Sequence, residues 1–150
     1  MLFRSSAGYT KYVPESEATI PGTGNFSGIY FQLGLSHRLN QYVDYSLNLG
    51  RSVNFALSGG TIDLYYARWA ANWKIFRKTF LSTSFDYENG SQIGSGGEKF
   101  TRYGPGITLG RPLTDKLSGS VGCQYYWRGS NLAGRDYTAF IISSDLRYRF

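Results

Sequence analysis

The chain has 150 residues, which suits one domain, and it carries 16 Lys and Arg against 10 Asp and Glu, a net charge of +6. Aromatic residues make up 17% and glycines number 19, a composition that favours strands and turns and excludes a coiled coil. The longest uncharged apolar run is far too short for a membrane-spanning helix, so a membrane protein of this composition would have to cross as a closed barrel.

The basic charge and the many aromatic residues also raise the possibility of a nucleic-acid-binding protein. The basic residues are spread along the chain at alternating positions and do not form a cluster. A charged barrel interior produces that pattern, and we therefore expect no nucleic-acid partner.

Alternation of apolar and polar residues predicts eight strands in one all-β, antiparallel, up-and-down transmembrane barrel. The second strand shows the pattern well, because Ile29, Phe31 and Leu33 alternate with Tyr30 and Gln32. The expected strands cover residues 3–13, 26–39, 43–57, 62–75, 80–88, 100–111, 117–128 and 140–150.

Two residues interrupt this alternation. Arg51 falls on the apolar parity, so either Gly50 marks a bulge or Arg51 lies at the membrane interface, where a long cation reaches headgroups. Pro105 cannot donate a hydrogen bond to a neighbouring strand, so we expect a bulge, a bend or a sheet edge there.

The links between strands differ in length on the two sides of the predicted sheet. Short polar links lie near residues 40, 78 and 114, and longer links on the other side include the glycine-rich residues 89–97, expected to be a mobile outer loop, and residues 131–136. Residues 58–60 predict a tight link. Short turns on one side and longer loops on the other are typical of bacterial outer-membrane barrels.

A hairpin repeat is visible in the spacing of four residues. Leu39, Phe76, Leu113 and Phe150 follow one another at intervals of 37 residues, which fits two membrane strands with their links. Phe76 falls on the opposite strand parity from the other three. The repeat is therefore approximate.

The end of the chain alternates between apolar and charged residues and closes on an aromatic residue. Leu146, Tyr148 and Phe150 share one face, and Arg149 lies on the other. This ending resembles the carboxy-terminal signal of bacterial outer-membrane β-barrels, although that signal usually has Gly where this chain has Asp145. The resemblance implies a Gram-negative outer-membrane location, with the lipid bilayer and the barrel-assembly machinery as partners.

Three segments resemble the hairpin repeats of the outer-membrane β-barrel porin family associated with exopolysaccharide export: residues 30–39, 110–122 and 145–150. Those barrels are longer than this chain. Residues 1–150 are accordingly expected to form a single barrel domain or the carboxy-terminal half of a larger barrel, and the start at Met1 shows no secretory signal.

Catalytic and metal chemistry is not indicated. His37 is the only histidine and is expected at a turn, so a Ser-His site has no natural place to form. Cys123 is the only cysteine and is expected to be a small lipid-facing residue. We therefore predict no enzyme activity, no catalytic residue, no metal site and no cofactor.

The charged residues on the inward parity are the candidate functional set. They could fill a closed eight-stranded barrel as a network of ion pairs, or line a passage whose basic excess favours anionic solutes or acidic polysaccharide. The expected lumen-lining residues are Arg4, Arg68, Lys74, Arg102, Arg128, Arg147, Arg149, Asp44, Asp86, Glu88 and Asp145.

Three functions remain open from the sequence. The first is a porin-like or polysaccharide-export-associated channel in the outer membrane, and the second is a small closed barrel with a structural or adhesive role. The third, a soluble lipocalin-like ligand-binding barrel, is disfavoured because it would bury Trp69, Trp73 and Leu47 and expose a face rich in Gly, Ser and Arg.

Overall fold

The structure, a computed structural model, describes residues 1–12, 26–56, 60–76, 78–93 and 97–149. In these ranges it contains eight strands, and no helix long and apolar enough to cross a membrane occurs among them. The strands are β1 (Leu2–Tyr12), β2 (Phe26–Arg38), β3 (Val43–Ala56), β4 (Gly60–Phe76), β5 (Thr79–Ile93), β6 (Lys99–Pro112), β7 (Leu117–Ser130) and β8 (Tyr137–Tyr148).

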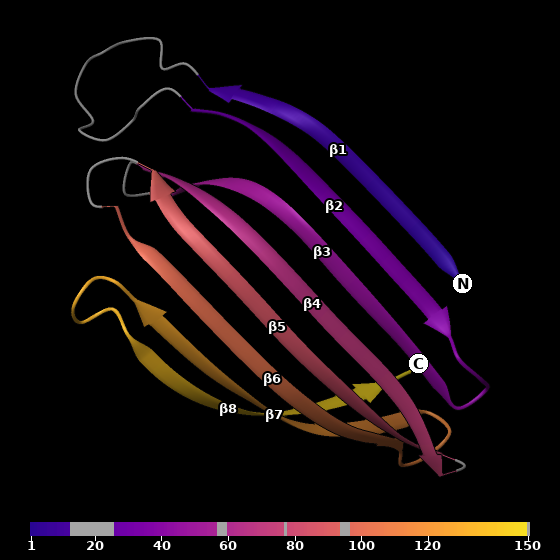
Figure 1. Ribbon diagram of the computed structural model, residues 1–150. Helices are drawn as coiled ribbons and strands as arrows, with labels where there is room; N and C mark the ends of the chain where they lie inside the picture. Colours follow the sequence, from indigo (N-terminus) through magenta and orange to yellow (C-terminus); the bar gives the residue numbers. More distant parts are fainter. Residues whose placement is uncertain (13–25, 57–59, 77, 94–96, 150) are drawn as a thin grey trace.

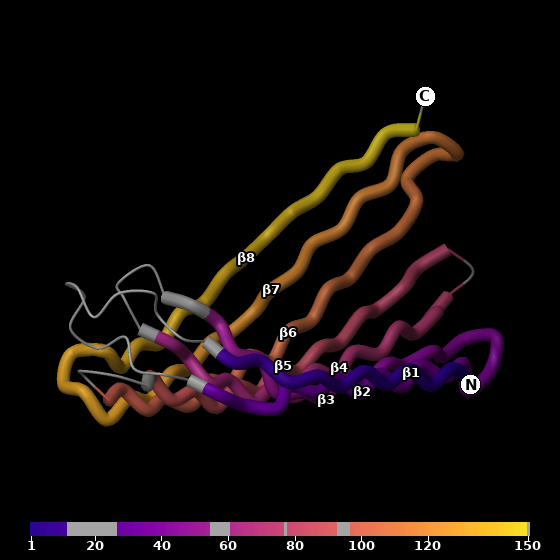
Figure 2. Tube along the Cα trace, turned by 90° about the horizontal axis from the view of Figure 1, so that it is seen from above, coloured from indigo at the N-terminus to yellow at the C-terminus, as the bar shows by residue number. Residues whose placement is uncertain are grey.

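All eight strands belong to one antiparallel sheet, in which each strand pairs with its neighbours in the sequence (Figure 1). The predicted all-β, up-and-down order is confirmed. Closure is absent, because β1 pairs only with β2 and β8 pairs only with β7. In Figure 2, β6 to β8 rise away from the layer formed by β1 to β4. Strand alternation and short turns order a sheet locally, but closing it requires a curvature that brings the first strand to the last.

Two of the short links have the same construction. The backbone N–H of Leu39 donates to the backbone oxygen of Val43 at 2.9 Å. Likewise, the N–H of Leu113 donates to the backbone oxygen of Leu117 at 2.8 Å. In each link the following side chain, Asn40 or Thr114, accepts hydrogen bonds from two backbone N–H groups. The links that begin at Leu39 and Leu113, two intervals of the predicted hairpin repeat apart, are therefore equivalent turns.

The second repeat position, Phe76, lies at a bulge. The register of β4 on β5 shifts between Lys74 and Phe76. A bulge inserts one extra residue and so reverses the face taken by the residues that follow. This explains why Phe76 falls on the opposite parity in the sequence.

The register gives the sheet one apolar and one polar face throughout. On the apolar face Leu35 lies opposite both Phe3 and Leu47. Trp69 lies opposite Leu47 on one side and Phe85 on the other. The predicted apolar and polar parities therefore meet correctly across every strand pair.

The apolar face does not pack against a second layer. In the described part of the chain, Ala71 is the only buried hydrophobic residue, at 2% exposure, whereas Trp73 is 43% exposed and Ile142 is 71% exposed. Soluble monomers rarely expose contiguous apolar patches of more than a few hundred Å². This face is therefore left uncovered by the described residues.

Arg51 lies on the apolar face without a bulge. Both Gly50 and Arg51 keep the regular register with β2 and β4, which excludes the bulge considered from the sequence. The Arg51 guanidinium instead forms two bonds to the Asp63 carboxylate, from Nε to Oδ1 at 2.8 Å and from Nη2 to Oδ2 at 2.9 Å. This paired geometry neutralises the charge on that face.

Pro105 lies in an interior strand, where it causes a local gap in pairing. It is aligned with Phe85 of β5, but the pairing of β6 with β7 is interrupted between Tyr103 and Gly106. The register is the same on both sides of the gap. The missing N–H of proline is therefore accommodated without the predicted bulge or sheet edge.

Candidate functional site: the polar concave face

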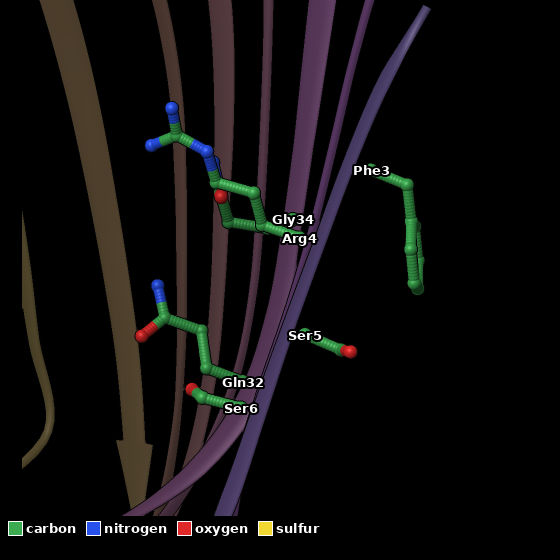
Figure 3. Close-up of a pocket in the computed structure, with 7 residues that line it drawn as sticks. Phe3, Arg4, Ser5, Ser6, Gln32 and Gly34 are labelled. Carbon is green, nitrogen blue, oxygen red and sulfur yellow. The ribbon is translucent and has the colours of Figure 1, made fainter.

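The polar side chains of the first two strands point toward the concave side of the sheet. In Figure 3, Arg4, Ser6 and Gln32 extend toward the other strands, whereas Phe3 and Ser5 point away from them. These residues border a recess of about 650 Å³. The polar face is therefore the inner surface of the curved sheet.

A network of ion pairs crosses the middle strands on this face. The Glu88 carboxylate of β5 forms two ion pairs. Its Oε2 lies 2.7 Å from Nη2 of Arg102 on β6, and its Oε1 lies 3.4 Å from Nη2 of Arg68 on β4. Arg68 also lies 3.8 Å from Asp86, whose carboxylate accepts a hydrogen bond from Gln124 of β7 at 3.3 Å. Only 8% of the Glu88 side chain is exposed, and a carboxylate so buried needs charged partners. Cross-strand register brings these residues together, because Arg68 opposes Asp86 and Arg102 opposes Glu88.

A second polar chain lies nearer the short turns. Asn72 donates from Nδ2 to the Asp44 carboxylate at 2.9 Å and accepts at Oδ1 from the Ser82 hydroxyl at 2.7 Å. The three residues lie on β3, β4 and β5, and both contacts are exposed to solvent. This chain ties three strands together on the polar face.

Aromatic rings on the polar face lie over glycines of the adjacent strand. A Cβ added at Gly50 would come within 2.5 Å of the Tyr66 hydroxyl oxygen, so the ring occupies the space that a side chain would take. The guanidinium of Arg68 lies 5.0 Å from the centre of the Tyr66 ring. Rings that lie along the sheet leave the concave side open. The glycine and aromatic pairs are Gly8 with Tyr30, Gly50 with Tyr66, Gly90 with Phe100, Gly104 with Tyr126 and Gly110 with Phe80.

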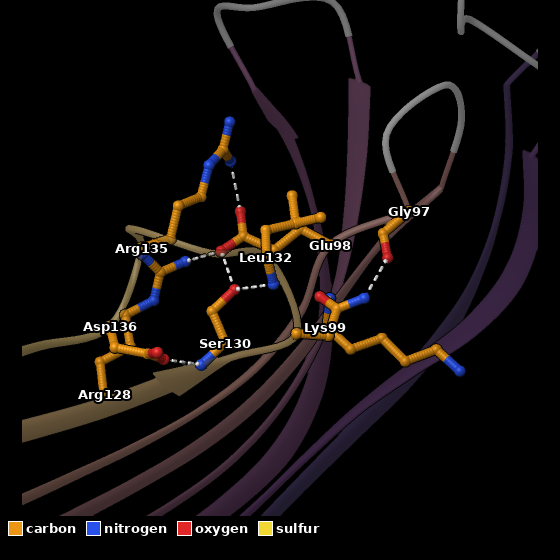
Figure 4. Close-up of polar contacts among 9 residues, drawn as sticks. Gly97, Glu98, Lys99, Arg128, Ser130, Leu132, Arg135 and Asp136 are labelled. Carbon is orange, nitrogen blue, oxygen red and sulfur yellow. Dashed lines mark hydrogen bonds and ion pairs between the residues drawn. The ribbon is translucent and has the colours of Figure 1, made fainter.

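A buried carboxylate joins the links at the end of the sheet away from the short turns (Figure 4). Glu98, just before β6, accepts at Oε1 from Arg128 at 2.8 Å and from the Ser130 hydroxyl at 2.9 Å. Its Oε2 accepts from Arg135 at 2.6 Å. The Glu98 side chain is 7% exposed. This cluster, called here the Glu98 cluster, fixes the start of β6 to the end of β7 and to the link that follows it.

The Glu98 cluster predicts a dependence of stability on pH. Burial alone raises the pKa of Glu98, but hydrogen bonds from Ser130 and Arg135 and the charges of Arg128 and Arg135 outweigh it, so the pKa lies below its ordinary value of 4.5. A carboxyl group with a lowered pKa stabilises the fold above its unfolded-state pKa, and this contribution is lost as pH falls through the folded-state value.

We expect Glu98→Gln to lower the urea midpoint of the detergent-folded chain at about pH 6 and to flatten its decline on acidification. The two urea midpoints should converge at low pH, where wild-type Glu98 is protonated. Asp115→Asn, in an exposed turn, is the matched control and should keep the wild-type profile. An unchanged profile in Glu98→Gln would contradict the assigned role.

The predicted lumen residues divide into two groups. The register places the predicted lumen residues that belong to strands on the polar face, as expected. Only some of them contact another side chain through a hydrogen bond or an ion pair. Those with side-chain partners are Arg68, Asp86, Glu88, Arg102, Arg128 and Asp44. Those with no side-chain ion pair to another described residue are Arg4, Lys74, Asp145, Arg147 and Arg149.

Sequence reasoning missed Glu98 and Arg135. Both fall next to or within stretches assigned as outer loops, and no local pattern connects residues 37 positions apart. The predicted mobile loop at residues 89–97 is also partly wrong, because residues 89–93 continue β5. Residues 94–96 of that loop and the expected link at 58–60, apart from Gly60, lie outside the described residues.

Cys123 lies on the expected face, whereas His37, expected at a turn, is a paired residue of β2 opposite Tyr45. His37 lies near the end of β2 at a short link, with its ring 5.5 Å from that of Tyr45 in an edge-on arrangement. Its Nδ1 is buried and has no hydrogen-bond partner among the described groups. Cys123 lies on the apolar face between Ile107 and Ile142. The described residues contain no group of three or more His, Cys, Asp or Glu side chains placed to hold a metal ion.

The structure describes two of the three residues of the predicted assembly signal, Leu146 and Tyr148. Leu146 and Tyr148 lie on the apolar face of β8, opposite Gly119 and Leu117 of β7. Leu146 is 73% exposed and is thus accessible on the outer side of the sheet. Phe150 lies outside the described residues.

The polar concave face is suited to electrostatic attraction of anions. In the part of the chain that the structure describes, its cations without ion-pair partners include Arg4, Lys74 and Arg147, and its acids without one include Asp44 and Asp145. Such a surface raises the local concentration of anions by its field.

Comparison of the chain with protein-family models, with curated proteins and with solved structures finds no match.

Proposed function

We propose that the chain forms a β-barrel of the bacterial outer membrane and acts as a porin-like or polysaccharide-export-associated channel with a basic lumen. The observation that carries the proposal is the apolar face, which continues across all eight strands and stays exposed. In a bilayer this face contacts lipid, and the opposite face contacts water. The strands have 11 to 17 residues, at or above the roughly 9 to 11 that a tilted membrane strand needs.

The proposed cargo is an anionic solute or an acidic polysaccharide. Support comes from the excess of unpaired cations on the concave face and from the flat aromatic rings, which leave that side open. Ordered charges along a passage select ions by sign.

A structural or adhesive barrel without an open passage is the second candidate. The network around Glu88 favours it, because Arg68 and Arg102 are both engaged by carboxylates and could fill a narrow interior. Conductance distinguishes the two candidates. A channel conducts ions in a planar bilayer, and a filled barrel does not.

The first test is the membrane itself. We expect the chain to require detergent for solubility and to migrate differently on gels before and after heating. A monodisperse soluble monomer without detergent would contradict the membrane proposal.

The second test is ion selectivity. Replacement of two unpaired concave-face cations, Lys74→Gln with Arg147→Gln, should lower the permeability ratio of chloride to potassium by about twofold or more. The matched control, Lys78→Gln with Lys116→Gln, removes the same charge from the short links and should leave the ratio unchanged. Reversal potentials in planar bilayers under a salt gradient measure the ratio. Equal effects of both double variants would contradict a selective concave face.

A further inference from the structure

The apolar face ends in a row of aromatic rings on β5, β6 and β7, toward the end of the sheet away from the short turns. Tyr87, Tyr103 and Trp127 lie opposite one another across these strands. The ring centres of Tyr87 and Tyr103 are 5.3 Å apart, and those of Tyr103 and Trp127 are 5.4 Å apart. Tyr and Trp gather where a membrane meets water, because their rings are apolar and their O–H and N–H groups are polar. The row therefore fits the level of a membrane interface.

Directly beyond this row the same face becomes polar and holds a recess of about 580 Å³. Asn89 and Thr101 lie opposite each other there, and Nδ2 of Asn89 donates to Oγ1 of Thr101 at 3.1 Å. Two residues further along the strands, Ser91 lies opposite Lys99. The recess is called here the Lys99 recess, and the residues that border it include Asn89, Ser91, Lys99, Thr101, Trp127 and Asn131.

Lys99 is a cation whose side chain has no ion pair with any described residue. The residue is exposed, and in Figure 4 its side chain extends away from the Glu98 cluster, although Glu98 is its neighbour in the chain. Its backbone is held, because the N–H donates to Oδ1 of Asn131 at 2.7 Å. The strand is therefore fixed at this point, and the amino group is available to an anion from outside.

A second cation on the outward face is already neutralised. Arg51 lies in the same row of paired residues as Asn89, with Tyr65 between them, and its guanidinium binds the carboxylate of Asp63. By contrast, the described residues that border the Lys99 recess include no Asp or Glu. A cation that loses water at a membrane interface needs an anionic partner. At Lys99 the protein does not supply one.

We infer that the Lys99 recess binds the phosphate headgroup of an anionic membrane lipid. The ammonium of Lys99 pairs with the phosphate, and Asn89, which uses one of its two amide N–H groups on Thr101, offers the other as a donor. The acyl chains lie along the outward residues of β6, among them Tyr103 and Ile107, which are both exposed. This inference rests on the proposed membrane function, because only a bilayer brings lipid to the outward face.

Quenching of tryptophan fluorescence by brominated lipids tests the site. The chain has three tryptophans, so Trp69→Phe with Trp73→Phe leaves Trp127, at the recess, as the only one. This variant is refolded into phosphatidylcholine vesicles that contain increasing fractions of brominated phosphatidylglycerol or, separately, of brominated phosphatidylcholine. The two quenching curves give the preference for the anionic lipid beside Trp127. We expect a preference of about fivefold, the effect of one cation near an anionic headgroup.

Variants of Lys99 in this background assign the preference to the recess. Lys99→Gln should reduce it to about one, whereas Lys99→Arg keeps the charge and should retain it. The matched control is Lys116→Gln, which removes the same charge from an exposed turn at the other end of the sheet and should leave the preference unchanged. An unchanged preference in Lys99→Gln would overturn the inference. So would equal losses in Lys99→Gln and Lys116→Gln, because net charge alone would then attract the lipid.

The same experiment separates this inference from the membrane proposal. Equal quenching by both lipids would overturn the headgroup site and leave the membrane proposal intact, because Trp127 would still contact lipid. Absence of quenching by either lipid would reject both. Inorganic phosphate, exchanged for chloride at equal ionic strength, should not change the preference. Loss of the preference in phosphate would assign the recess to a soluble anion and overturn the lipid site.

Discussion

Leu47→Arg is expected to destabilise the folded chain in lipid vesicles by about 2 to 4 kcal/mol, the cost of a cation on the lipid face near the bilayer midplane. Leu47 lies on the apolar face between Leu35 and Trp69, with no carboxylate opposite it. Leu33→Arg should have a similar effect, because Leu33 lies on the same face opposite Ser5 and Leu49.

The matched control is Gln32→Arg, adjacent to Leu33 but on the polar concave face. Gln32 is exposed there and lies opposite Ser6 and Gly50. Urea titrations of the folded, heat-modifiable fraction in vesicles measure all three variants. Equal losses on both faces would show that the sheet does not present its apolar face to lipid.

Arg51 provides an internal comparison for this prediction. It is a native cation on the apolar face, and its bidentate contact with Asp63 shows the condition under which that face accepts charge. Leu47→Arg would have no such partner. The expected penalty therefore depends on the missing carboxylate as well as on depth in the membrane.

Deletion of Phe150 is expected to block assembly in cells while having a much smaller effect on refolding into detergent. The resemblance of the chain end to the outer-membrane signal implies that the assembly machinery reads Leu146, Tyr148 and Phe150. In detergent no machine has to recognise the strand, which needs only to pair with β7 and cover its apolar face. The deletion removes only one residue, so the folding energy should change little.

The control for this prediction is Arg149→Ser. The backbone N–H of Arg149 donates to the oxygen of Lys116 at 2.8 Å, and the substitution preserves that bond. The amount of heat-modifiable protein in outer-membrane fractions should fall sharply for the deletion and stay near normal for Arg149→Ser. Normal insertion of the deletion variant would mean that the terminal Phe acts only as another apolar residue.

Strand positions followed closely from the sequence because the alternation of side chains is local. Ile29, Phe31 and Leu33 lie on one face of any extended strand, whatever surrounds it. The turn at Asn40 then fixes how β2 meets β3, so the alignment of Leu35 with Leu47 also follows from short-range pattern. The parity of the predicted lumen residues was correct for the same reason.

The contacts of those residues depended on register and on distant links. Arg68 meets Glu88 because hairpin register carries β4 past β5, and sequence parity alone does not choose that partner over Asp44 or Asp145. The Glu98 cluster could not be predicted from the sequence at all. It joins residues from the start of β6, the end of β7 and the following link, and only the folded sheet brings these three places together.

The number of strands, their order and the faces they present could be predicted, since period-two alternation and short polar turns act over a few residues. The absence of pairing between β1 and β8, the ion pair of Arg51 with Asp63 and the contact of Glu98 with two arginines became visible only in the folded sheet. Closure and charge pairing depend on the twist and curvature accumulated over all eight strands, and no local pattern of residues records that sum.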